Sequence, residues 1–154
     1  MNIHLLHPPK EQQPVAATLA REIIRALPDG AVTISATNEE SGALESDLVV
    51  AVFSLRHGTY APTVASYRDL RDKKVAFVAV LTGPVDPARV RKTIWGSKKQ
   101  FCGNQMTGAY LCPADDDVAW GISETEVGKC RDFLRRIYET NSQADHIQAL
   151  AVNG

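Results

Sequence analysis

The sequence has few cysteines, almost no excess charge and no long apolar run, and each absence excludes a class of protein. Cys102, Cys112 and Cys130 are widely spaced and odd in number, which argues against a disulfide framework or a zinc site. The formal net charge is -1, which favours neither nucleic acid nor an anionic membrane as a partner. No apolar run approaches the roughly 20 residues of a membrane-spanning helix. A globular protein of the reducing cytoplasm is therefore expected.

The sequence also lacks the motifs of several enzyme classes. It contains no Gly-x-Ser-x-Gly elbow, Walker A loop, Gly-x-Gly-x-x-Gly fingerprint or His-Glu-x-x-His pair. Asp115–Asp117 lacks the spacing and the glycine of a calcium loop, so no metal site is predicted there. The N-terminal stretch has no charged region or cleavage site before Pro8-Pro9, so a first strand is expected and not a signal peptide.

What the 154 residues do contain is an alternation of strand-like and helix-like segments. Strands are expected at 2–7, 31–36, 47–53, 74–81 and 107–112, and the third and fourth are apolar enough for burial on both faces. This alternation is typical of βαβ units, so the sequence predicts an α/β fold with a three-layer, doubly wound, five-stranded parallel sheet. The domain is expected to span 1–140, with a C-terminal tail at 141–154.

Helix signals separate the expected strands. Pro14 suits the first turn of a helix over 14–27, and Asp86-Pro87 is a cap followed by proline. A weaker pattern predicts a helix over 60–70. Ser123 and Glu126 have the spacing of a capping box at the start of the last helix, which is expected to reach about residue 138. In such sheets a ligand lies at the carboxyl ends of the strands, so the loops at 7–13, 54–60 and 82–86 are the candidate site.

The segments 47–53, 54–59 and 73–83, taken in order, resemble the flavodoxin-like family. The nearest pattern is a short branch with Gly-Thr in the second loop and a strand reading Phe-Leu-Cys, which correspond here to Gly58-Thr59 and to 109–112. The resemblance runs from about residue 1 to 138. It implies the strand order 2-1-3-4-5 and an FMN cofactor, with its phosphate in the first loop and its ring between the second and third.

The resemblance also assigns residues to the flavin. The ring would lie against backbone and side chains of the second and third loops: Ser54, Arg56, His57, Gly58, Thr59, Tyr60, Thr82, Gly83 and Pro84. A glycine lets backbone approach the ring edge, and an aromatic side chain can stack on the ring. An arginine near the ring places positive charge beside the reduced flavin. For Gly58-Thr59, a flavin contact and a plain loop with a helix cap stay equally open.

The first loop departs from the family pattern, which is a Ser/Thr-rich anion nest with a Thr-Gly-Asn-Thr-like core. Residues 8–14 include three prolines and no glycine or hydroxyl, and Glu11 would repel a phosphate. The residues predicted to hold the phosphate are Lys10, Gln12 and Gln13, aided by the helix dipole.

Two functions therefore stay open. The first is an FMN-binding electron-transfer protein that serves a redox partner protein. The second is a cofactor-free accessory or binding protein of a redox system. A flavin-dependent reductase acting directly on a substrate is a weaker third, so a redox carrier is favoured over a substrate-specific enzyme.

For one cysteine and two histidines on the expected strands, a structural interpretation is favoured. For Cys112 a buried structural thiol is favoured over a reactive one. His4 is expected to be packed or partly exposed within the first strand. His7 ends that strand at the ligand edge, where a functional role is possible but less favoured.

Overall fold

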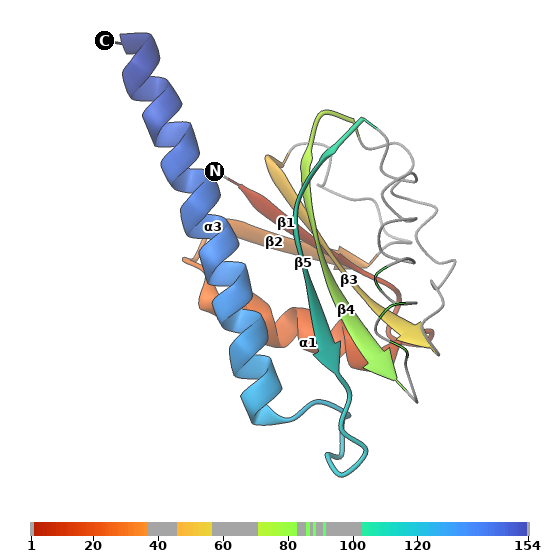
Figure 1. The fold of residues 1–154 in the computed structure, drawn as a ribbon. Helices are drawn as coiled ribbons and strands as arrows, with labels where there is room; N and C mark the ends of the chain where they lie inside the picture. Colours follow the sequence, from red (N-terminus) through yellow and green to blue (C-terminus); the bar gives the residue numbers. More distant parts are fainter. Residues whose placement is uncertain are drawn as a thin grey trace.

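The computed structural model describes residues 2–36, 46–56, 71–82 and 103–153, together with positions 86, 88 and 91. The side chains of residues 55, 56 and 143–153 lie outside that description. Within it, five strands form one parallel sheet of order β2-β1-β3-β4-β5, which confirms the predicted order (Figure 1). They are β1 (Ile3–His7), β2 (Val32–Ala36), β3 (Leu48–Arg56), β4 (Lys74–Thr82) and β5 (Gln105–Pro113).

One face of the sheet is covered by α1 (Pro14–Ile23) and α3 (Glu124–Asn153), which lie side by side in Figure 1. A short 3-10 turn, η1 (Ile24–Ala26), follows α1. Alternate residues of β1, β3 and β4 pack beneath these helices with Leu19, Ile23, Leu134 and their neighbours in one apolar cluster. The spacing of apolar residues in both helices produces this packing, because residues three and four apart share one helix face.

The opposite face of the sheet is buried as well. Its cluster contains Val49, Phe53, Phe77 and Ala79, which are at most 1% exposed. The rings of Phe53 and Phe77 meet edge to face with centroids 5.7 Å apart. Burial on both faces explains why β3 and β4 are almost continuously apolar in sequence.

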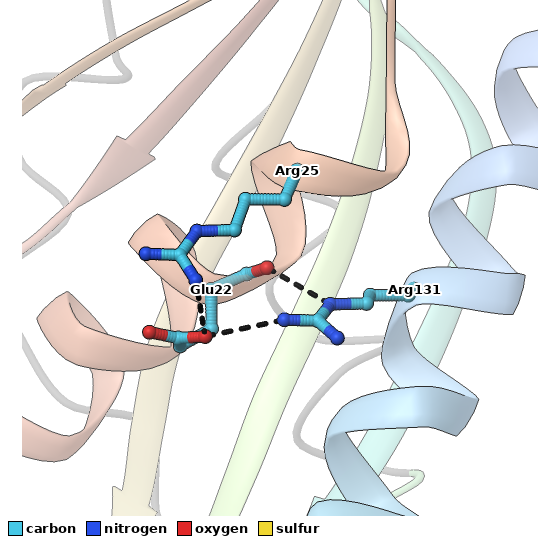
Figure 2. A network of polar contacts seen from close by, with 3 residues as sticks. All are labelled: Glu22, Arg25 and Arg131. Atoms are coloured by element: carbon cyan, nitrogen blue, oxygen red, sulfur yellow. Dashed lines mark hydrogen bonds and ion pairs between the residues drawn. The ribbon is translucent and has the colours of Figure 1, made fainter.

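An ion-pair network fixes α3 against α1 (Figure 2). The Arg131 guanidinium lies 3.1 Å from the Glu22 carboxylate, and its Nε donates to the Glu22 main-chain oxygen at 3.0 Å. Arg25 lies 3.6 Å from the same carboxylate. Because Arg131 bonds a carbonyl at the end of α1 as well as a side chain, it fixes the relative position of the two helices.

The helix-start signals identified in the sequence are present in the structure. Pro14 is the first residue of α1. The Glu126 N–H donates to Ser123 Oγ at 3.3 Å, one half of the predicted capping box. Asp86 Oδ1 accepts from the Ala88 N–H at 3.0 Å, and positions 88 and 91 have helical backbone. The helix predicted over 60–70 lies outside the described residues.

The predicted ends of β3 and of the last helix are both too early. β3 pairs residue by residue with β4 as far as Arg56↔Thr82, so Ser54 and Arg56 belong to the strand and not to the loop after it. The backbone of α3 is helical to Asn153, well past the predicted helix end near residue 138. The segment after Asn141 contains no glycine or proline before Gly154, so nothing in it breaks a helix. The domain boundary at residue 140 stays a prediction.

Candidate functional site

The candidate site lies where the strand order reverses, at the carboxyl ends of β1 and β3. Pairing between these strands ends at Leu6↔Ala51, whereas β3 continues alongside β4 for five more residues. Among the described strands, the part of β3 beyond Ala51 therefore has no neighbour on the side of β1. Backbone donors on such an edge need partners from a loop, a side chain or a ligand.

Gln13 supplies one of those partners. It is the N-cap residue of α1, yet its side chain makes no capping hydrogen bond. Its Oε1 instead accepts from the Ser54 N–H at 2.8 Å. The amide thus takes the place of a β1 residue, and a donor that a bound ligand would otherwise meet is already satisfied.

The loop before Gln13 closes on itself. The Gln12 and Gln13 N–H groups both donate to the Pro9 carbonyl oxygen, at 2.9 and 3.0 Å. Pro8 and Pro9 are buried, and neither has an N–H. An anion nest needs successive N–H groups converging on one point in space. In this loop they converge on a carbonyl oxygen, which occupies the position that the anion would need.

The start of α1 offers little more to an anion. Pro14 removes the first N–H of the helix, and the Ala17 N–H already donates to the Gln13 carbonyl at 3.1 Å. Within the described part of the chain, the Val15 and Ala16 N–H groups are the donors of the first turn that remain. Lys10, predicted to help hold the phosphate, has an exposed side chain.

The three residues predicted to hold the phosphate are therefore brought into one turn but not into one nest. Lys10 and Gln12 are exposed on the turn, and the Gln13 side chain is directed to β3. The phosphate end of FMN does not fit this corner as it would fit an anion nest. We call the group formed by residues 8–16 and Ser54 the closed corner.

The residues predicted to contact the ring are described only in part. Ser54 and Thr82 are half-buried near the ends of β3 and β4. They occupy positions on the α1 side of the sheet, since Val52 and Val80, two residues earlier, belong to the cluster beneath α1. Only the backbone of Arg56 is described, paired with Thr82. The others lie outside the described residues: His57, Gly58, Thr59, Tyr60, Gly83 and Pro84.

His4, the first of the two histidines of β1, has a structural role. His4 is buried, with Nδ1 bonded to Thr33 Oγ1 and Nε2 lying 2.8 Å from Ser35 Oγ on β2. Burial lowers the pKa of the His4 imidazole below 6.5. The ring therefore stays neutral at physiological pH and ties the edge strand β2 to β1.

The cysteines of β5 and α3 are equally inaccessible. Cys112 and Cys130 are free thiols with no exposed surface. A hydrogen bond between the two thiols, together with burial, raises the pKa of Cys130. A buried structural thiol at position 112 is confirmed. Cys102 lies outside the described residues.

A cavity beside the closed corner was not predicted from the sequence. It has a volume of about 390 Å³ and opens between the end of β2 and α1. Its lining residues come from the end of β1, the first loop, α1 and the end of β2: His7, Pro9, Lys10, Glu11, Arg21, Ile34, Ser35 and Ala36. Arg21 could not be found by inspecting the loops, because it is a helix residue whose long side chain reaches the sheet edge.

Comparison with solved structures places the fold in a known class. A flavodoxin of Streptococcus pneumoniae TIGR4 matches 91% of this chain and 99% of its own, with a TM-score of 0.63 and 12% identity. The Trp repressor binding protein of Bacillus subtilis matches 88% and 98%, with a TM-score of 0.63 and 14% identity. A Lactobacillus acidophilus flavoprotein solved in complex with FMN matches 71% and 92%, with a TM-score of 0.52 and 9% identity.

The chain therefore has a flavodoxin-like fold. At these identities the likeness establishes the fold and not the activity. No protein-family model and no curated protein sequence matches the chain. In the part of the chain that the structure describes, no helix is both long and apolar enough to cross a bilayer.

Proposed function

We propose that this chain is a flavodoxin-like, FMN-binding electron-transfer protein that grips the flavin by its ring and gains little from its phosphate. The strand order supports the first part, because it creates a ligand edge at the reversal between β1 and β3. The match to an FMN-bound flavoprotein supports the choice of cofactor. The closed corner carries the second part, because its Gln12, Gln13 and Ser54 N–H groups already have partners within the chain.

The flavin, when bound, would supply the electron chemistry, and the protein would supply position and electrostatics. Ser54 and Thr82 mark the strand ends between which the ring would lie. The predicted ring contacts at 56–60 and 83–84 would flank it. The proposed redox partner protein would meet the exposed ring edge.

A second candidate function is favoured by the closed corner itself. A chain whose phosphate donors are satisfied internally has lost several charge-assisted hydrogen bonds, each worth roughly 1.5–3 kcal/mol. If the ring contacts are also weak, the protein is a cofactor-free binding protein of a redox system. This candidate predicts no binding of any flavin.

Titration of FMN fluorescence with the purified protein separates the two candidates. The first predicts quenching at micromolar protein, and Gly58→Val, within the predicted ring loop, should weaken it. Gly128→Val is the control outside the predicted loops, because Gly128 lies in α3 and an added Cβ there meets nothing within 4 Å. Absence of quenching by the wild-type protein would overturn the first candidate. Quenching that is unchanged by Gly58→Val would mean that the second loop does not contact the ring.

A further inference from the structure

The cavity beside the closed corner is distinct from the proposed flavin site. It lies on the β2 side of β1, whereas the flavin edge lies on the β3 side. Ile34, Ala36 and His7 occupy strand positions that face α1, because Ile34 and Leu5 pack in the cluster beneath that helix. The volume of about 390 Å³ falls within the range of small-molecule sites, roughly 300–1,000 Å³.

Two cationic side chains line this cavity. Arg21 comes from α1 and Lys10 from the first loop. Neither forms an ion pair with any residue in the described part of the chain. By contrast, Arg25 and Arg131 on the same helical layer both pair with Glu22. With Glu11 also in the lining, the formal charge of the Arg, Lys and Glu side chains around the cavity is +1.

His7 adds a hydrogen-bond acceptor. It is only 5% exposed, and its Nδ1 lies 2.8 Å from the Pro8 carbonyl oxygen. A carbonyl oxygen accepts hydrogen bonds only, so Nδ1 carries a proton, and the tautomer with its proton there has Nε2 as an acceptor. No contact within the described residues occupies Nε2. A ligand hydroxyl group would supply a hydrogen-bond donor for Nε2.

We propose that the cavity binds a small hydroxylated dianion, through Arg21 and Lys10 at its anionic oxygens and through His7 Nε2 at its hydroxyl. Two ligand classes share this chemistry, hydroxydicarboxylates and hydroxylated phosphate monoesters. Arginine forms paired hydrogen bonds with carboxylate and phosphate alike. The cavity shares Lys10 with the predicted phosphate residues, but the proposed ring contacts lie on the β3 side of β1, so the cavity does not depend on flavin binding.

Calorimetric titration at constant ionic strength tests the site with two matched pairs of probes. In the first pair, malate has one hydroxyl group that succinate lacks. In the second pair, glycerol phosphate has two hydroxyl groups that propyl phosphate lacks. The hydroxylated member of one pair should bind about tenfold more tightly, and that pair identifies the ligand class. Inorganic phosphate should bind more weakly than the preferred probe. Equal affinities within both pairs would overturn the proposal.

Variants test the individual contacts. Arg21→Met should weaken binding of the preferred probe about tenfold, while Glu11→Gln should strengthen it, because the carboxylate repels the anion. Arg135→Met removes an exposed charge on α3 that does not line the cavity, and it should change nothing. His7→Asn retains a donor for Pro8 but lacks Nε2, so the hydroxyl preference should disappear. Equal effects of Arg21→Met and Arg135→Met would show only a surface-charge effect and would overturn the site.

FMN distinguishes failure of this proposal from failure of the proposed function. If FMN binds at the ring loops, its affinity should be the same in Arg21→Met and wild type. Competition between FMN and the preferred probe would place the flavin in this cavity and overturn the claim of a separate site. Failure of FMN to bind leaves the two probe comparisons unchanged.

Discussion

Gln13→Ala removes the hydrogen bond that closes the corner. The substitution deletes the acceptor 2.8 Å from the Ser54 N–H, at a half-buried position. A lost hydrogen bond costs about 1 kcal/mol, and a buried N–H left without a partner costs about 1–3 kcal/mol. Water replaces part of the lost bond at a half-buried position, so we expect a loss of about 1–2 kcal/mol in unfolding free energy.

Urea denaturation measures this loss. With a slope of about 2 kcal/mol/M for a small domain, the unfolding midpoint should fall by about 0.5–1 M. Gln12→Ala is the matched control, because the Gln12 side chain is exposed and only its N–H is bonded in the loop. It should change the free energy of unfolding by less than about 0.5 kcal/mol.

Hydrogen exchange of the Ser54 amide gives a local measurement of the same bond. This amide should be protected in the wild type and in Gln12→Ala, and should exchange faster in Gln13→Ala. Equal exchange in all three proteins, or equal midpoints for the two variants, would refute the closed corner.

Three further predictions concern the scaffold. Arg131→Met should lower the unfolding free energy by about 1 kcal/mol in denaturation experiments, since it loses both contacts with Glu22; no change would mean that the network is solvated. Because burial lowers the pKa of His4 below its unfolded value of 6.5, the unfolded chain binds more protons, so stability should be complete above pH 6.5 and fall as the pH drops below it. His4→Gln should flatten that pH dependence, and an unchanged slope would mean that another group causes it. Gly121→Ala should destabilise more than Gly30→Ala, because both have positive φ but only at Gly121 does the added Cβ lie 3.1 Å from Val15; equal losses would leave backbone strain as the sole cause.

Much of the fold could be predicted because its signals are local and repeated. The apolar runs in β3 and β4 indicate strands buried on both faces, and Pro14 and Ser123 mark helix starts. Strand order came from a family resemblance, since periodicity alone does not say which strands are neighbours. The end of β3 was placed too early because Ser54 and Arg56 are polar, although pairing with β4 holds them in the strand.

The site was less predictable because its contacts join residues distant in sequence. The sequence shows that the first loop lacks glycine and hydroxyl groups, but not that Gln13 bonds residue 54 across 41 positions. Nor does any pattern bring Arg21 and His7 to one cavity. Both features depend on where α1 packs against the sheet, which composition does not encode.

The most direct test of the closed corner compares the dissociation constants of FMN and riboflavin, which differ only by the phosphate. Because the corner presents no nest, the two flavins should bind within about tenfold of each other. A preference of a hundredfold or more for FMN, about 2.7 kcal/mol or more, would show strong contacts to the phosphate and contradict the account.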